Sequence, residues 1–418
     1  MKSKYKPYSS YKDSGVEWLG LLPESWEARR LGFYFSERRE KVSDKDYPAL
    51  SVTKKGIVPQ LDSAAKTDDG DNRKKVCVGD FVINSRSDRK GSSGLSELTG
   101  SVSLINTIIT PKSIDGKYTH NLLRSYPFQE EFYRYGKGIV ADLWSTNYTS
   151  MKNILIPFPP LSEQQTIAHY LDSATAKIDT LIEKQTKLIA LLKEKRQAVI
   201  STAVTRGLEN QHGDWNKYRL DWVSSIVRGN IGFKKDELLD NGEYVALQYG
   251  KTYKVDEVNK KFEFYINKEF YKFSQLVHCG DTILISTSET VEDLGHSCFY
   301  NRDDLGLIGG EQILLKPDTK LLCDKYLYYS SKVFCSGLKK YASGLKVFRF
   351  NTDDLKKIFI SIPSLENQQD IANYIDDKTS KIDILIEKST KSIVLLKERR
   401  VALISAAVTG KIDVREIA

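Results

Sequence analysis

The stretch Lys177-Ile-Asp-Thr-Leu-Ile-Glu-Lys184 returns 204 positions later as Lys381-Ile-Asp-Ile-Leu-Ile-Glu-Lys388, and this repeat decides the fold. The similarity runs without a gap over 156–209 and 360–413, where 31 of the 54 aligned positions are identical. Each copy follows a longer segment of about 150 residues, and those two segments resemble each other little. A repeat of so long a period is not a solenoid but indicates a duplicated unit, made of one domain and one helix.

Each copy of the repeat predicts a long amphipathic helix, because apolar residues recur at steps of three and four with near-heptad spacing. The start signals are Pro159-Pro160-Leu161-Ser162 and Pro363-Ser364, in which a proline and a serine cap precede the apolar period. Gly207 and Gly410 stand just past the last apolar turn, where a C-terminal cap belongs. The positions assigned to a coiled-coil seam are Ile178, Leu181, Ile182, Ile189, Leu192, Val199, Ile382, Leu385, Ile386, Ile393, Leu396 and Leu403.

Two near-identical apolar stripes in one chain can bury each other as a two-helix coiled coil. If a pseudo-twofold axis relates the two units, the helices must run antiparallel. The alternative is two separate parallel helices, each packed on its own domain. We favour the antiparallel pair because the apolar positions coincide across the copies.

The two longer segments predict mixed α/β domains, so the fold class is α+β with a pseudo-twofold internal duplication. Short β-rich runs follow a Gly-Asp turn in both segments, at Phe81-Val82-Ile83 and at Thr282-Ile283-Leu284-Ile285. These segments are therefore expected to be diverged copies of one domain. The predicted boundaries are a first domain at 1–158, a first helix at 159–210, a second domain at 211–362 and a second helix at 363–418.

The net charge of +8 on 418 residues is unevenly distributed. Residues 1–155 carry 25 Lys/Arg against 19 Asp/Glu, whereas residues 211–361 carry 22 against 21. The first domain therefore suits a polyanion better than the second. The five cysteines form no C-x-x-C pair, their spacing with histidine matches no zinc pattern, and no apolar run reaches membrane-spanning length. A reduced, cytoplasmic location is expected.

The chain resembles a known family, the specificity subunits of type I restriction–modification systems. The resemblance rests on Tyr11-Lys-Asp-Ser-Gly-Val-Glu-Trp-Leu-Gly20 with Pro23-Glu-Ser-Trp26, and on the helix entries at Pro159–Gln165 and Pro363–Gln369. The ending Ala407-Val-Thr-Gly-Lys-Ile-Asp413 is also similar to the family's C-terminus. These motifs cover the whole chain in the order of domain, helix, domain and helix.

The resemblance implies two target-recognition domains, separated by an antiparallel coiled coil, each reading one half of a split sequence in double-stranded DNA. It implies no catalysis and no cofactor in this chain, which docks two methylation subunits that methylate adenine. S-adenosylmethionine, ATP and Mg are expected on the partner subunits. Restriction subunits complete an ATP-dependent endonuclease used in host defence.

The sequence lacks the motifs of the enzymes with which it could be confused. The nearest match to an Asn/Asp-Pro-Pro-aromatic methyltransferase loop is Pro157-Phe-Pro-Pro160, which has no acid or amide and stands at a helix entry. There is no phosphate-binding Gly-x-x-x-x-Gly-Lys-Ser/Thr loop. Two alternatives remain open: a non-catalytic adaptor whose two domains bind proteins, and a nuclease or methyltransferase with unrecognised motifs.

DNA sequence is read by side chains that reach base edges, while cationic and backbone groups hold phosphates. Basic loops with interleaved polar and aromatic residues are therefore the candidate DNA contacts, and the glycine-rich loops 84–94 and 248–253 rank first among them. The candidates in the first domain are Thr53, Lys54, Lys55, Asn84, Arg86, Arg89, Lys90, Trp144 and Tyr148. Those in the second are Lys234, Lys235, Gln248, Tyr249, Lys251, Tyr253, Lys346 and Arg349.

Overall fold

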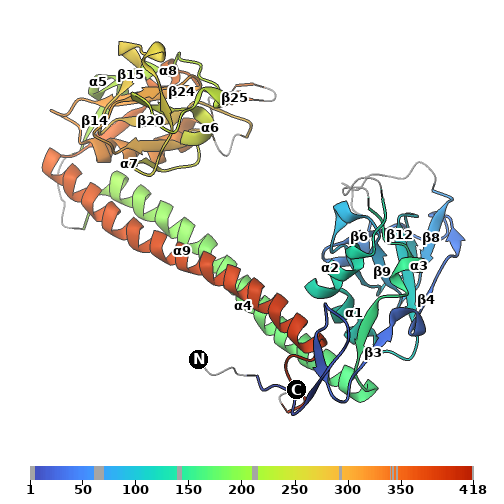
Figure 1. The fold of residues 1–418 in the computed structure, drawn as a ribbon. Helices are drawn as coiled ribbons and strands as arrows, with labels where there is room; N and C mark the ends of the chain where they lie inside the picture. The colour runs from blue at the N-terminus through green and yellow to red at the C-terminus, as the bar shows by residue number, and fades with distance from the viewer. Residues whose placement is uncertain are drawn as a thin grey trace. The chain divides into compact units, whose positions relative to one another are not determined.

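The computed structural model describes residues 5–60, 70–138, 144–209, 215–290, 294–338, 340, 343–344 and 347–416. The chain divides into two compact units, which Figure 1 shows as two sheet-rich bodies carried on long helices. Unit 1 consists of Met1–Thr186 and Thr390–Ala418, and unit 2 is Lys187–Ser389. Both boundaries fall inside the long helices, so each unit contains one end of each helix.

The two repeat copies form the helices α4 (Leu161–Arg206) and α9 (Leu365–Val408), of 46 and 44 residues. Gly207 and Gly410 end them with φ values of +77° and +71°, which confirms both predicted C-terminal caps. In these left-handed conformations a side chain would clash with the backbone.

The two helix starts differ at their caps. The Ser364 hydroxyl accepts a hydrogen bond from the Asn367 N–H at 3.3 Å, as a cap should. In the first copy α4 begins directly after Pro160, whose carbonyl accepts the Gln164 N–H. Ser162 therefore lies inside the first turn, and its prediction as the cap was wrong. The second proline of this copy takes the place that serine has in the other.

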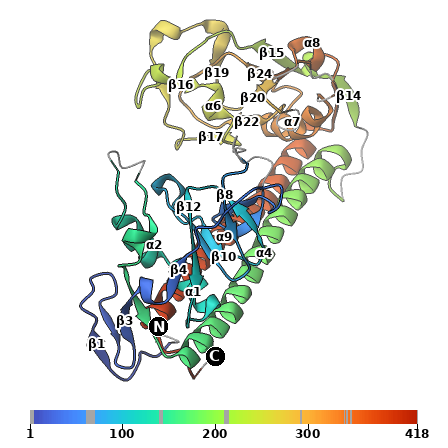
Figure 2. The same cartoon turned by 90° about the vertical axis from the view of Figure 1, so that its right-hand side faces the viewer.

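The ends of α4 and α9 pack together in each unit, and they do so antiparallel. In unit 1 the start of α4 lies beside the end of α9, and Arg400 donates to Asp179 at 2.9 Å. In unit 2 the end of α4 lies beside the start of α9, and Arg196 donates to Asp383 at 3.0 Å. The two ion pairs are the same repeat positions with the helices exchanged, which confirms the antiparallel arrangement (Figure 2).

The helix–helix seam is narrower than the apolar stripe predicts. Its positions alternate steps of four and three, at 178, 182, 185, 189, 192, 196 and 199 on α4 and 204 residues later on α9. Ile178, Leu192, Ile382 and Leu403 are buried, and Ile182, Ile189, Val199, Ile386, Ile393 and Leu396 are partly buried. Leu181 and Leu385 are 47% and 49% exposed. Their assignment to the seam was wrong, because each stands one position before a seam residue and so faces outward.

Unit 1 packs two sheets and three short α-helices with its helix pair. The first sheet has the strand order β10-β9-β12-β4, and the second has β11-β8-β5. The hairpin β6-β7 adds to the second layer, the pair β3-β13 leads into α4, and the hairpin β1-β2 lies near the chain start. The bounds are β1 Tyr11–Asp13, β2 Leu21–Pro23, β3 Glu27–Arg30, β4 Phe35–Glu37, β5 Lys41–Val42, β6 Leu50–Thr53, β7 Gly56–Pro59, β8 Arg73–Val76, β9 Phe81–Asn84, β10 Ser93–Leu95, β11 Gly100–Val102, β12 Asn106–Pro111, α1 Gly116–Leu123, α2 Tyr126–Arg134, α3 Tyr148–Met151 and β13 Leu155–Phe158.

Unit 2 repeats this plan. Its first sheet has the order β15-β24-β20-β22-β17, its second has β18-β16-β23-β19, and β14-β26 leads into α9. A single helix, α7, replaces α1 and α2. The bounds are β14 Asn216–Arg219, α5 Leu220–Val223, β15 Ser224–Arg228, β16 Tyr244–Leu247, α6 Tyr249–Thr252, β17 Glu257–Val258, β18 Tyr265–Ile266, β19 Leu276–Val277, β20 Thr282–Ile285, β21 Thr287–Ser288, β22 Ser297–Tyr300, β23 Gly306–Ile308, β24 Gln312–Pro317, α7 Asp324–Leu338, β25 Phe348–Arg349, α8 Thr352–Leu355 and β26 Phe359–Ile362.

Corresponding turns and strands confirm that the two domains are diverged copies. Gly79 and Gly280 adopt φ values of +87° and +93°, and the following Asp80 and Asp281 each accept a backbone N–H three residues upstream. The strands that follow, β9 and β20, are buried along their whole length, as their apolar runs predict. The α+β fold class is confirmed as well.

One main core in each unit joins the first sheet to the short helices and to the ends of the long helices. In unit 1 it includes Phe81 of β9, Tyr118 of α1 and Ile167 of α4. In unit 2 it includes Leu284 of β20 and Tyr326 of α7. Burial of apolar surface therefore fixes each domain to its helix pair, leaving the far loops of the sheets free for other contacts.

Candidate nucleic-acid interface

Each domain is tied to the long helices by one buried tyrosine. In unit 1 the Tyr118 hydroxyl lies 3.2 Å from the Pro157 carbonyl of β13 and 3.3 Å from the Val408 carbonyl at the end of α9. In unit 2 the Tyr326 hydroxyl lies 2.7 Å from the Ser361 carbonyl and 3.3 Å from the Val204 carbonyl. Burial raises the pKa of both phenols, so each remains a donor.

A buried glutamine near the start of each long helix makes a second matching anchor. The Gln164 side chain accepts the Asp115 N–H at 2.9 Å and donates to the Pro159 carbonyl at 2.9 Å. Gln368 accepts the Cys323 N–H at 2.8 Å and donates to the Pro363 carbonyl at 2.9 Å. The same frame therefore positions both domains on the helix pair, and differences between the domains lie in their loops.

Two of the predicted contact loops of the first domain lie together. The tight turn between β6 and β7 exposes Lys54 and Lys55, while the Thr53 hydroxyl bonds to the Gly56 carbonyl and so shapes the turn. The 3-10 helix Ser87–Arg89 follows β9. Lys54 and Lys90 line one pocket, so the two basic loops share a surface.

Arg86, Arg89 and Trp144 form a further part of this surface. An isolated β-bridge joins Arg86 to Ser145, and the Trp144 carbonyl accepts the Ser87 N–H at 2.9 Å. Trp144 is 38% exposed, and the side chain of Arg89 is 67% exposed. Asp88 lies 3.5 Å from both arginines, so neither ion pair is tight. These three side chains can reach a ligand that lies across the loop.

Two candidates of the first domain have structural roles. Asn84 is buried, and its side-chain oxygen accepts the Arg86 N–H at 3.1 Å. The Tyr148 hydroxyl donates to the Phe35 carbonyl at 2.6 Å. Both polar groups shape the loop from within the domain, and neither is presented to a DNA base here.

In the second domain the prediction that residues 248–253 form a glycine-rich loop is wrong. Residues Tyr249–Thr252 form the helical turn α6, with Gln248 at its start. Tyr249 and Tyr253 stack with their ring centroids 6.1 Å apart, and the Lys251 ammonium lies 4.2 Å from the ring centre of Phe264. Residues Tyr249–Thr252 form a helical turn because Tyr249 and Tyr253, which are four residues apart, pack on each other.

The remaining candidates of the second domain differ in exposure. Lys234 and Lys235 are exposed beside the 3-10 helix Lys235–Glu237. Arg349, on β25, is exposed and lies 3.5 Å from Glu311. Glu311 has a φ of +67° in the turn before β24, a conformation that residues other than glycine rarely adopt. Lys346 lies outside the described residues.

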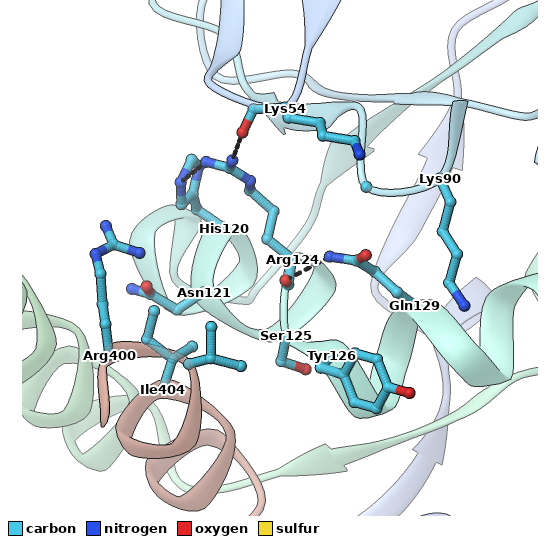
Figure 3. A pocket seen from close by; sticks show the side chains of 12 residues that line it. Lys54, Lys90, His120, Asn121, Arg124, Ser125, Tyr126, Gln129, Arg400 and Ile404 are labelled. Carbon is cyan, nitrogen blue, oxygen red and sulfur yellow. Dashed lines mark hydrogen bonds between the residues drawn. The ribbon is translucent and has the colours of Figure 1, made fainter. Parts of the chain in front are cut away.

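The structure also places together basic residues that the sequence patterns did not single out. Arg124, His120 and Arg400 line the pocket that Lys54 and Lys90 share (Figure 3). They come from the end of α1 and from α9, far apart in the sequence. Of these three residues, only Arg400 could have been singled out from the sequence, because it is a polar residue at a position of the helix–helix seam.

Other kinds of site are absent from the part of the chain that the structure describes. No group of three or more His, Cys, Asp or Glu side chains is arranged to hold a metal ion. All five cysteines are free thiols, two of them buried. Among the described residues, none of the helices combines the length and apolarity needed to cross a membrane.

Sequence comparison places this architecture among known proteins. The family model described as type I restriction modification DNA specificity domain matches residues 131–191 and 212–393, more than half of the chain. The putative type I restriction enzyme MjaX specificity subunit of Methanocaldococcus jannaschii is 26% identical, over 95% of this chain and 96% of its own length. The EcoBI specificity subunit of Escherichia coli is 23% identical, over 63% and 59%.

Solved structures share the fold. A chain from a study of complex assembly and conformational transition of the type I R-M system superposes with a TM-score of 0.74 at 17% identity, covering 93% of this chain and 98% of its own. The HsdS subunit of Thermoanaerobacter tengcongensis gives 0.57 at 17% identity, over 94% and 98%. With the family match, these similarities establish that the chain belongs to the type I restriction–modification specificity family, as the non-catalytic DNA specificity subunit of such a complex.

Proposed function

We propose that the two domains, residues 1–158 and 211–362, each read one half of a split DNA sequence, and that α4 and α9 set the distance between the halves. Two methylation subunits would dock on the helices and methylate adenine in each half. S-adenosylmethionine, ATP and Mg would act on those subunits and on the restriction subunits. Catalysis would thus lie wholly on the partners.

The observation that carries this proposal is one frame with two different reading surfaces. The tyrosine and glutamine anchors recur at equivalent positions in both units. The loops above them differ in sequence and secondary structure. The 3-10 helix Ser87–Arg89 follows β9, whereas β21, which pairs with β25, follows the equivalent strand β20. A shared scaffold that carries different loops is what we expect of two domains that recognise different DNA sequences. Arginine is suited to guanine and tryptophan to apolar contact, so the two surfaces would select different bases.

Exposed leucines that recur in the repeat support the docking of two identical partners. In unit 1, Leu181 of α4 and Leu395 of α9 are 47% and 64% exposed. Their repeat counterparts in unit 2 are Leu385 of α9 and Leu191 of α4, which are 49% and 52% exposed. Both units thus expose this leucine pair, with the two helices exchanged between the units. Large apolar side chains left open at equivalent places suit contact with a partner, and one pair in each unit accommodates one copy of it.

The test is methylation sequencing in a bacterial host that lacks its own DNA methylation. The host expresses this chain together with a methylation subunit from the same operon, and a control strain expresses the methylation subunit alone. We expect one split motif with methyladenine in both halves, present only with this chain. A stable co-purified complex that leaves no new methylation would contradict the proposal.

A second experiment separates the two reading surfaces. Arg89→Ala removes an exposed candidate of the first domain, and Arg349→Ala removes one of the second. Each lost base contact costs about 1–3 kcal/mol of discrimination at one base position. We expect Arg89→Ala to relax one half of the motif and Arg349→Ala the other. Relaxation of the same half by both variants would count against one reader per half.

A further inference from the structure

A pocket of about 280 Å³ in unit 1 is lined by cations and by no carboxylate. It lies where the end of α1 and the start of α2 meet α9 (Figure 3). Lys54 and Lys90 reach it from the two basic loops, and Arg124 and Arg400 from the helices. Its other lining residues are neutral. A partly enclosed space with several positive charges attracts an anion.

The charge in this pocket is poorly compensated. Arg400 pairs with Asp179, and Lys90 pairs with Glu130. Arg124, in contrast, has no carboxylate partner within the described ranges; its guanidinium bonds to the Lys54 carbonyl and approaches His120. Burial, and then the charge of Arg400, lower the pKa of Arg124. A partly buried guanidinium without a counter-charge is destabilising until an anion joins it.

The contact between Arg124 and His120 does not satisfy the arginine. Burial and Arg124 lower the pKa of His120 to about 4, so the ring is neutral at pH 7. Its Nδ1 accepts the Leu95 N–H at 3.2 Å, which places the single ring proton on Nε2. The Arg124 Nη1 group lies 3.0 Å from Nε2, so the ring engages one of the three guanidinium nitrogens. The guanidinium therefore has N–H groups left for a ligand.

Unit 2 has a carboxylate at the equivalent position. Lys332 follows Tyr326 by six residues, as Arg124 follows Tyr118, and Arg196 is the repeat counterpart of Arg400. Asp256 accepts from Lys332 at 2.7 Å and pairs with Arg196 at 3.2 Å. Although burial raises the pKa of Asp256, Lys332 and Arg196 lower it below its ordinary value. The protein's own anion thus joins these two cations in unit 2.

The helices differ at the same place. In unit 2 the continuous α7 runs through position 332, whereas in unit 1 the chain breaks after α1 and starts α2 at Tyr126. Ser125, at the N-cap of α2, makes no side-chain cap hydrogen bond. The break directs the N-terminus of a nine-residue helix into the pocket, and its dipole adds to the positive potential.

We propose that this pocket binds a backbone phosphate of DNA, held by Arg124 with Lys54, Lys90 and the start of α2. The proposal rests on the DNA-reading function above. A phosphate fits because the two lysines come from the loops predicted to contact DNA, and a duplex on those loops would present its backbone there. The first domain thereby fixes the register of DNA on this chain, whereas in the second domain Asp256 occupies the two equivalent cations, Lys332 and Arg196.

The experiment measures DNA binding by the complex of the full chain with its methylation subunit, by fluorescence anisotropy over a range of salt concentrations. One duplex carries the motif found by methylation sequencing and another lacks it. We expect Arg124→Gln to weaken binding to both duplexes by the same factor. It should also make the slope of log K against log salt shallower by about 0.9, the value for one phosphate. Lys332→Gln, the matched variant in unit 2, should leave the slope unchanged.

A second variant keeps the test decisive if Arg124→Gln folds poorly. Asn121→Asp places a carboxylate in the same pocket, as Asp256 does in unit 2. We expect it to raise the melting temperature and to reproduce the shallower salt slope. Unchanged slopes in folded variants would overturn the phosphate site, whereas a wild-type complex with no preference for the motif would overturn the proposed function instead.

Two further outcomes identify another anion and would also overturn the proposal. If inorganic phosphate raises the melting temperature of the wild type but not of Arg124→Gln, and the DNA salt slopes stay equal, the pocket binds a free phosphoanion. If Arg124→Gln loses the methylation subunit while the remaining chain keeps its DNA slope, the pocket binds a carboxylate of that partner.

Discussion

Gln164 and Gln368 illustrate how single residues hold each domain in place. Both are fully buried, and each amide pairs its oxygen with a backbone N–H of the domain and its nitrogen with the carbonyl of the proline before the long helix. A glutamine amide supplies N–H donors and a carbonyl acceptor at a fixed distance, which no apolar side chain can do. The glutamine is therefore required by two backbone groups that would otherwise be buried without partners.

Replacement of either glutamine by alanine should destabilise its own unit by about 1–3 kcal/mol, because a buried N–H and a buried carbonyl lose their partners. Unfolding in urea, followed by circular dichroism, measures the loss. We expect a somewhat larger loss for Gln368→Ala than for Gln164→Ala, because the Gln368 amide also donates to the Leu321 carbonyl at 3.0 Å. The exposed neighbour Gln165→Ala is the control and should have almost no effect. A loss below about 0.5 kcal/mol at both buried positions would contradict the anchoring role.

At the residue scale the sequence predicts which loops carry charge, but not which side chains point outward. Asn84 and Tyr148 have the right chemistry for DNA contacts, yet their polar groups bond to backbone within the domain. Arg124 and Arg400 were not predicted because their proximity depends on how α1 lies against α9. Composition and spacing do not contain that distance.

At the scale of elements, the heptad seam explains both the correct and the incorrect predictions. The repeated apolar period predicted α4 and α9, and a pseudo-twofold relation between the two units predicted their antiparallel direction. The same period could not separate seam residues from flanking leucines. Leu181 and Leu385 stand three residues after the seam residues Ile178 and Ile382, which heptad spacing allows, but the observed seam takes the next positions, Ile182 and Ile386. Some seam positions are occupied by polar residues, which a count of apolar residues overlooks. These are Gln185 and Arg196 on α4 and Ser389 and Arg400 on α9.

The exposed leucine pairs on these helices predict how many partners bind. Leu191→Glu should prevent docking on unit 2 and Leu395→Glu on unit 1, because a charge cannot enter an apolar interface without a large desolvation cost. Size-exclusion chromatography with light scattering should show one bound methylation subunit for each single variant and none for the double variant. Val394→Glu is the control, since Val394 is 51% exposed but its repeat counterpart is Ala190. Two bound subunits on the double variant would disprove this docking surface.

The spacing role of the helices predicts the effect of lengthening them. Thr186 and Thr390 are repeat counterparts, and both stand at the boundaries between the units. Duplicating the heptads that end there, 180–186 and 384–390, keeps the seam in phase and lengthens each helix by about 10 Å. At about 3.4 Å per base pair, we expect the unspecified gap in the methylated motif to grow by roughly three pairs, with both halves unchanged.

Methylation sequencing measures this gap directly. Duplication in α4 alone is the control, because it puts the two seams out of register and should destabilise the protein. An unchanged gap with both heptads inserted would refute the spacing role.

At the scale of the whole molecule, the two domains have the same arrangement on the long helices but differ in net charge. The first domain has a net charge of +6 over residues 1–155, and the second has +1 over residues 211–361. The structure adds a reason for this difference. Asp256 neutralises Arg196 and Lys332 inside unit 2, while the equivalent cations of unit 1 face an open pocket. We therefore expect fewer phosphate contacts from unit 2 than from unit 1.

The isolated chain should consequently bind DNA weakly and gain affinity when the methylation subunits join it. The partners would supply phosphate contacts, chiefly over the half read by the second domain, so the salt dependence of binding should become steeper in the complex. Fluorescence anisotropy with and without partner measures both quantities on the same duplex. Footprinting of the isolated chain should protect the first half of the motif more than the second, because Arg124 and its neighbours hold only that side. Equal affinity and an equal salt slope with and without partner would refute this division of contacts between the subunits.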